Sequence, residues 1–212
     1  MRPALHSQPP HPWRKRIDIA VLVSGSGTNL QALIDSTDIR PAISVVISDN
    51  PDAVGLRRAE KAGIPTVVVA WGDHPDRATF STAVADEVEA HGAKVVVLAG
   101  FMRVLSPQFI ERFPNRILNI HPSVLPAFPG SGAVQAALER GVTVTGVTVH
   151  FVDEQVDHGP IVSQRVVNVE ASDTVETLHA RIQVEEHEVY PQAVKALLDG
   201  RLTVEAGRVV WS

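Results

Sequence analysis

The chain comprises 212 residues, of which 44% are hydrophobic and 20% charged, a size and balance typical of a single globular domain. Its formal net charge of −5 at pH 7 argues against a surface for nucleic acid or anionic membranes. The absence of cysteine excludes disulfides, thiolate zinc sites and a cysteine nucleophile, and it fits a reducing compartment such as the cytoplasm.

Residues 1–16, MRPALHSQPPHPWRKR, hold four of the fifteen prolines. They lack the apolar core of roughly 7–15 residues that a signal peptide needs. We therefore predict a disordered leader, with a short organellar presequence as the alternative. No later apolar run approaches the ~20 residues of a membrane span.

From residue 17, apolar runs alternate with amphipathic segments. The runs predict strands over 17–23, 42–48, 65–70, 93–100 and 116–120, and the segments between them predict helices over 29–36, 53–63 and 77–91. This alternation indicates an α/β fold with a doubly wound, mostly parallel sheet that is covered on both faces.

The pattern changes after residue 140. Residues 144–152 and 161–169 alternate apolar and polar side chains, as antiparallel strands with one wetter face do. A long helix over 174–199 and a terminal hairpin over 202–212 follow. We therefore expect residues 17–212 to form one Rossmann-like domain that ends in antiparallel strands and a long helix.

The segment SGSGTN (24–29) lies between the first strand and the first helix. Its glycines let the backbone approach an anion, and Thr28 and Asn29 stand where free amides point outward. It lacks the Gly-Lys-Ser/Thr of a Walker loop and the third glycine of a dinucleotide fingerprint. Phosphate binding and a plain strand–helix turn therefore both remain open.

The segment NIHPS (119–123) ends the fifth predicted strand, where open α/β sheets bind their ligands. A period of two puts Asn119 and His121 on the same side, and Pro122 keeps His121 extended. An amide donor and an imidazole can then converge on one reacting atom. The alternative is a capped strand end with an incidental histidine, but the pairing with Asn119 favours a site.

The turn at 153–161 is rich in polar side chains, namely Asp153, Glu154, Asp157 and His158. It fits a solvated hairpin tip, or a carboxylate that orients a histidine from elsewhere in the fold. Zinc or iron ligation by His121, His150, Asp157 and His158 is a third reading. No pair of histidines has ligand spacing, so we expect no metal.

Two further segments combine polar and apolar residues. Arg103 lies beside Met102, Val104 and Leu105, a mixture that suits a flat heterocycle with an acidic tail or, alternatively, a helix-entry loop whose apolar residues are core. In the long helix, Glu186 falls at the edge of an apolar stripe, where a carboxylate needs a partner. A ligand amine or an internal arginine would serve.

Taken together, these segments resemble the folate-dependent glycinamide ribonucleotide formyltransferases over about residues 17–211. The resemblance rests on the order and spacing of VLVSGSGTNLQALID, SDNPDAVGLRRAEKAGIPT, VVVLAGFMRVLSP, ILNIHPSVLPAFPG, GVTVHFVDEQVDHGPIV and the Glu-His-x-x-Tyr-Pro run at 186–191. It implies transfer of a formyl group from 10-formyltetrahydrofolate, as co-substrate, to the amine of glycinamide ribonucleotide in de novo purine biosynthesis. Only small-molecule partners are implied, and the oligomeric state stays open, a homodimer included.

The resemblance also implies roles for individual residues. The catalytic trio would be Asn119, His121 and Asp157. The ribonucleotide would contact Gly27, Thr28, Asn29, Arg77 and Glu186. The folate would contact Met102, Arg103, Leu105 and the backbone from Val152 to Asp157.

One segment departs from the family pattern. Many members read Pro-Gly-x-His after the catalytic strand, whereas this chain has Gly132 in place of the histidine. A formyltetrahydrofolate deformylase is the nearest rival, although it normally carries an additional amino-terminal domain. Methionyl-tRNA formyltransferase would add an RNA-binding domain, and a non-catalytic nucleotide-binding module would not need the trio.

Overall fold

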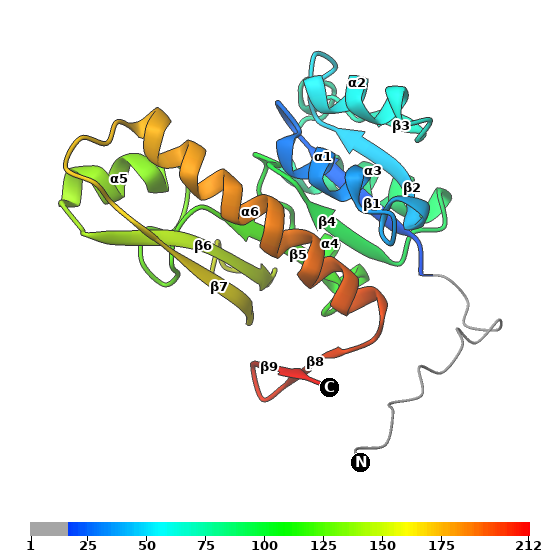
Figure 1. Ribbon diagram of the computed structural model, residues 1–212. Helices are drawn as coiled ribbons and strands as arrows, with labels where there is room; N and C mark the ends of the chain where they lie inside the picture. The colour runs from blue at the N-terminus through cyan, green and yellow to red at the C-terminus, as the bar shows by residue number, and fades with distance from the viewer. Residues whose placement is uncertain (1–16) are drawn as a thin grey trace.

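The computed structural model describes residues 17–212, and the leader predicted over 1–16 lies outside the described residues (Figure 1). Seven strands form one sheet in the order β3-β2-β1-β4-β5-β6-β7. The strands of this sheet are β1 (Ile19–Val23), β2 (Ile43–Ser48), β3 (Thr66–Val68), β4 (Val95–Leu98), β5 (Ile117–His121), β6 (Val144–Phe151) and β7 (Ile161–Asn168). The α-helices are α1 (Thr28–Asp35), α2 (Val54–Lys61), α3 (Arg77–Ala90), α4 (Pro107–Arg112), α5 (Ala133–Arg140) and α6 (Val175–Leu198).

The first five strands are parallel and covered on both faces, which confirms the predicted doubly wound sheet. Strand β1 is wholly buried, and its alternate residues face opposite layers of the core. Val21 belongs to the core layer that contains Leu30 of α1 and Ile182 of α6, whereas Leu22 belongs to the layer that contains Phe80 of α3. The continuous apolar runs in the sequence therefore reflect burial on two sides.

The chain reverses its direction of winding at β1, which pairs with β2 on one side and β4 on the other. Open α/β sheets bind ligands outside the carboxyl ends of the strands at such a point. The loops after β1 and β4 meet there, since the Ser24 N–H donates to the Gly100 carbonyl and the Met102 N–H donates to Ser24 Oγ, at 3.1 and 2.8 Å. This end of the sheet therefore positions the candidate site.

Strands β6 and β7 continue the sheet as antiparallel strands, as predicted, but the wetter face expected for β6 is absent. Every residue of β6 after Val144 is buried. Thr148, one of its polar positions, bonds instead to the segment after β5: the Leu125 N–H donates to Thr148 Oγ1, which donates to the Ser123 carbonyl. The alternation in β6 therefore reflects polar side chains that contact protein rather than water, whereas β7 is exposed at several positions.

Two short helices, α4 and α5, were not assigned from the sequence. Helix α5 begins after Gly132, whose φ of +78° lies in the left-handed region that glycine adopts without strain. Gly132, which stands where many family members have a histidine, is thus the residue at the N-cap of this helix. Helix α4 buries only Phe109, and α5 buries mostly alanine, at Ala133 and Ala137, so neither segment carries a clear apolar stripe.

The carboxy-terminal part agrees with prediction. Helix α6 starts at a capping box formed by Thr174 and Thr177 and lies across one face of the sheet (Figure 1). Strands β8 (Leu202–Glu205) and β9 (Arg208–Trp211) form the predicted hairpin. Among the described residues, no helix has the length and apolar character needed to cross a membrane.

Candidate active site

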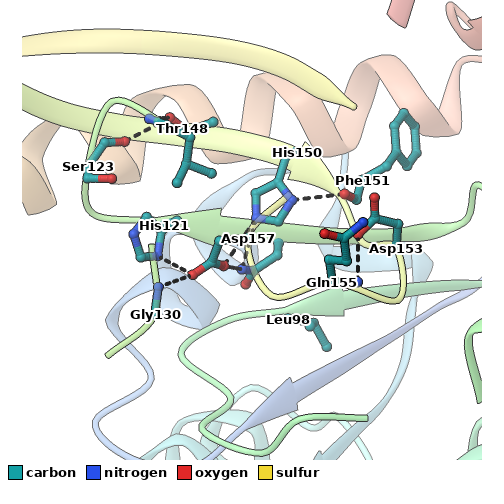
Figure 2. Close-up of polar contacts among 12 residues, drawn as sticks. Leu98, His121, Ser123, Gly130, Thr148, His150, Phe151, Asp153, Gln155 and Asp157 are labelled. Atoms are coloured by element: carbon teal, nitrogen blue, oxygen red, sulfur yellow. Dashed lines mark hydrogen bonds and ion pairs between the residues drawn. The ribbon is translucent and has the colours of Figure 1, made fainter. Parts of the chain in front are cut away.

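Asp157 is the centre of a polar cluster at the carboxyl end of β5 (Figure 2). His121 Nδ1 lies 3.2 Å from Asp157 Oδ2, and Asn119 Nδ2 donates to Asp157 Oδ1 at 3.3 Å. Because both side chains contact the same carboxylate, Asn119 and His121 lie on one side of β5, as the period of two predicts. The turn after β6 therefore supplies a carboxylate that orients a histidine from another strand.

Close backbone contacts fix the turn that carries Asp157. A Cβ on Gly159 would lie 2.0 Å from the Phe151 carbonyl oxygen, so only glycine fits at this position. Asp157 itself has a φ of +51°, in the left-handed region that aspartate tolerates better than most residues. From the opposite side, the Gly130 N–H donates to Asp157 Oδ2 at 2.7 Å.

His150 belongs to the same cluster, although the sequence suggested it only as a metal ligand. Figure 2 shows His121 and His150 flanking Asp157, with His150 Nε2 3.6 Å from Asp157 Oδ1 and 3.2 Å from Asn119 Nδ2. His150 Nδ1 lies 2.8 Å from the Phe151 carbonyl and therefore carries a proton. The missing signal was strand pairing, since Asn119 stands opposite His150 in the β5–β6 ladder.

The partners of His121 constrain its protonation. Its Nδ1 faces the Asp157 carboxylate, and its Nε2 lies 2.8 Å from the Phe128 carbonyl oxygen. Both partners are acceptors, so the arrangement suits an imidazolium that donates from both ring nitrogens. His121 can therefore carry a positive charge or hold a proton for transfer.

Several neighbours act on the ionisation of Asp157. Burial alone would raise its pKa, but the contacts with His150 and with the Gly130 N–H, and the charges of His121 and His150, outweigh it. The net result is a pKa of Asp157 below the ordinary value of 3.8. Asp157 is thus ionised at neutral pH and can stabilise a protonated histidine.

The predicted phosphate loop lies between β1 and α1 and is shaped by glycine. Gly27 has a φ of +68°, and a Cβ there would lie 2.6 Å from Gly55 Cα, so both conformation and space require glycine. Gly27 is also the residue before α1, where no side chain caps the free amides. The loop therefore leaves donors of the first helical turn available to an anion.

Glu186 is buried, and its partner is Asn29, which donates to Glu186 Oε2 at 2.9 Å. The predicted phosphate loop and helix α6 are thus joined, and among residues 17–212 no arginine pairs with Glu186. The second polar atom of this amide, Asn29 Oδ1, is buried and has no hydrogen-bond partner among the residues that the structure describes. A ligand N–H would satisfy it.

The loop has a cationic neighbour that the sequence analysis missed. Arg58 of α2 donates from Nε to the Ser26 carbonyl at 2.8 Å, and it lines a cavity of about 610 Å³ together with Thr28 and His187. By contrast, Arg77 is exposed as the first residue of α3, and in the described part of the chain it makes no hydrogen bond or ion pair with the loop. The apposition of α1 and α2 at Gly27 and Gly55 is what brings Arg58 close.

The predicted folate residues fall in different environments. Met102 is 70% exposed, and Arg103 lines a cavity of about 460 Å³ with Trp71 and Ser24. Leu105 is 6% exposed and packs in the core beside α3, and its contact with folate stays a prediction. Val152 is partly buried against the same core. Within residues 17–212, no three potential ligand side chains are grouped so as to hold a metal ion.

The chain resembles known proteins over most of its length. A formyl transferase family model matches residues 17–194. The phosphoribosylglycinamide formyltransferase of Escherichia coli is 42% identical over 88% of this chain and 89% of its own length. The crystal structure of glycinamide ribonucleotide transformylase 1 from Symbiobacterium toebii superposes with a TM-score of 0.89 at 49% identity, covering 92% of this chain and 94% of that one.

Two other relatives differ in length. The trifunctional purine biosynthetic protein adenosine-3 of Bos taurus is 47% identical over 93% of this chain, which spans only a fifth of that protein. A formyltetrahydrofolate deformylase from Pseudomonas syringae is 31% identical with a TM-score of 0.84, and the match covers 66% of its chain. On the strength of the full-length matches, this chain belongs to the formyl transferase family, among the phosphoribosylglycinamide formyltransferases.

Proposed function

We propose that the protein transfers the formyl group of 10-formyltetrahydrofolate to the amine of glycinamide ribonucleotide in de novo purine biosynthesis. The observation that supports this most directly is the contact of Asn119 and His121 with Asp157 at the carboxyl end of β5. The cluster combines an oxyanion donor, a proton carrier and a carboxylate in one place, and it contains no side chain that needs to act as a nucleophile.

In the proposed reaction, the neutral amine attacks the formyl carbon, and a tetrahedral intermediate with an oxyanion forms. The intermediate collapses with cleavage of the bond to the folate N10, which takes up a proton while the former amine loses one. Formylglycinamide ribonucleotide and tetrahydrofolate are the products. The chemical task is therefore to stabilise one oxyanion and to move one proton.

Asn119 would donate to the oxyanion, an interaction typically worth about 10²–10³ in rate. Its Nδ2 contacts Asp157 and His150, so one of these bonds would be exchanged for the oxyanion. His121 would add positive charge or protonate N10, and Asp157 would orient His121. General acid–base catalysis of this kind is typically worth a factor of about 10²–10⁴ in rate. His150 would fix the positions of the Asn119 and Asp157 side chains relative to each other.

The binding residues follow the same division. Gly27, Thr28 and Asn29 would take the phosphate, with Arg58 as the nearest cation, and Glu186 would hold the glycinamide end. Arg77 stays a prediction as a further contact. Met102, Arg103 and the backbone from Val152 to Asp157 would receive the folate. A metal-free reaction, a cytoplasmic location and a homodimer also stay predictions.

The direct test is to follow folate release from 10-formyltetrahydrofolate with and without glycinamide ribonucleotide. Release that requires the ribonucleotide, with formylated product formed in equal amount, supports the proposal. Release without the acceptor would instead identify a deformylase. If neither occurs while glycinamide ribonucleotide still binds, the chain is a non-catalytic binding module. The Asp157→Asn variant, with its fold checked by circular dichroism, provides the inactive control.

A further inference from the structure

A buried carboxylate holds Arg103, the cation of the proposed folate side. Arg103 Nε donates to Asp49 Oδ2 at 2.7 Å. Asp49 directly follows β2, and its side chain is only 2% exposed, whereas the side chain of Arg103 is 39% exposed. The pair therefore consists of a fixed anion beneath a cation that reaches solvent.

The guanidinium is also held from its face. Arg103 Cζ lies 4.9 Å from the centroid of the Trp71 ring, within the range of a cation–π contact. Among the described residues, Arg103 Nη1 and Nη2 make no hydrogen bond. Asp49 and Trp71 thus fix the orientation of the group and leave its two-nitrogen edge for a ligand in the cavity of about 460 Å³.

The Arg103–Asp49 pair carries no net charge, although an anion-binding position usually has a positive one. Within the described part of the chain, Asp49 Oδ1 is buried without a hydrogen bond, and Arg103 is the partner that compensates the carboxylate. An incoming carboxylate would meet a cation whose charge is already countered by an anion on its other side. The site is built to orient an acidic group yet to attract it weakly.

We infer that Asp49 is a positioning residue that aligns Arg103 for the carboxylate tail of the folate donor and lowers the affinity for that tail. This rests on the proposed function, since folates end in a glutamate with two carboxylates. The ring system of the folate donor carries no carboxylate, so the negative charge that meets Arg103 would come from the glutamate tail. Asp49 therefore sets how strongly the enzyme distinguishes a donor with the acidic tail from one without it.

The Asp49→Asn variant separates the two effects of Asp49. Its amide oxygen can still accept from Arg103 Nε, but the negative charge is gone. We expect the KM and the Kd of a 10-formyl-dideazafolate with its glutamate to fall about two- to fivefold, the range of one partly exposed charge contact. For the same compound without glutamate, we expect no change, and kcat should stay the same for both.

Two further variants complete the design. Asp52→Asn makes the same change in net charge at an exposed position of the same loop and should leave both donors unaffected. Asp49→Ala removes the acceptor as well as the charge and should raise the KM of the tailed donor relative to Asp49→Asn. The advantage of Asp49→Asn should shrink in high salt, because screening weakens exposed charge contacts.

The outcomes distinguish this inference from the proposed function. Transfer that proceeds normally, with Asp49→Asn altering tailed and tail-free donors equally or Asp52→Asn acting the same way, overturns the role of Asp49 alone. Absence of donor binding and of transfer in every protein, wild type included, overturns both. Calorimetric binding of the tailed and tail-free compounds in the absence of the acceptor measures the effect independently of turnover.

Discussion

Gly159 lies two residues after Asp157, and replacing it by alanine tests whether turn geometry controls catalysis. The added Cβ would lie 2.0 Å from the Phe151 carbonyl oxygen, whereas real Cβ atoms almost never come closer than 3.0 Å. Because the obstacle is backbone, the two segments must separate by about 1 Å or more. Because Asp157 belongs to the same turn as Gly159, its 3.2 Å contact with His121 would lengthen.

The expected magnitude follows from that displacement. A misplacement of about 1 Å near reacting groups can cost about 10²-fold in rate, so kcat/KM of Gly159→Ala should fall by about that factor. Strain from overpacking should lower the free energy of unfolding by about 1–3 kcal/mol. The assay is ribonucleotide-dependent folate release, with circular dichroism to verify that the variant is folded.

Gly141→Ala provides the matched control. Gly141 also has a positive φ, +70°, but an added Cβ meets nothing within 4 Å and lies at the end of α5, outside the polar cluster. It should cost about 1–2 kcal/mol of stability for the left-handed conformation and leave kcat/KM unchanged. A folded Gly159→Ala variant with normal kcat/KM would refute the argument that this turn sets the position of Asp157.

Three other predictions concern single interactions. Asn119→Ala should lower kcat about 10²–10³-fold with little change in the Kd of either substrate, and weak binding with normal turnover would contradict the oxyanion role. Because the pKa of Asp157 is lowered, its ionised form stabilises the fold above the ordinary carboxyl value, and this contribution is lost as the pH falls through the lowered pKa. The difference in unfolding free energy between the wild type and Asp157→Asn, measured by urea titration at each pH, should therefore be largest above about pH 5 and shrink toward about pH 3. A difference that stays constant between these pH values would exclude a contribution of the Asp157 ionisation to stability. Gly27→Ala should raise the Kd of glycinamide ribonucleotide at least about tenfold by moving the backbone away from Gly55, while calorimetric binding of the folate analogue stays unchanged; equal weakening of both ligands would argue against a local effect on the phosphate loop.

The parallel half of the fold could be predicted because burial on both faces leaves continuous apolar runs. The wetter face expected for β6 was wrong, since Thr148 bonds to the segment after β5 and His150 to the polar cluster. A sequence pattern records polarity but does not distinguish water from a polar protein partner. Helix α5 was missed because the side chains that it buries, Ala133, Val134 and Ala137, form only a weak apolar stripe.

The candidate site was predictable where its residues follow one strand, as Asn119 and His121 do. His150, Arg58 and Asp49 were missed because each approaches through a neighbouring element, and pairwise contacts across elements leave no local spacing to detect. The side chain of Leu105 packs in the core, and its predicted contact with folate stays a prediction. Assignment of these residues needed the strand order and the register.

The hydrogen bond between Asn29 and Glu186 joins positions that are 157 residues apart. The strands that frame the phosphate loop are all synthesised before α6 emerges from the ribosome. Until that helix docks, Asn29 lacks its hydrogen bond to Glu186, and the proposed site for the glycinamide end is incomplete. Helix α6 also supplies Ile182 and Tyr190 to the core layer that contains Val21, so its docking completes that layer and the proposed pocket together. Ribonucleotide binding would therefore report on the completion of folding, and we expect a chain that stops before residue 175 neither to fold stably nor to capture the ribonucleotide.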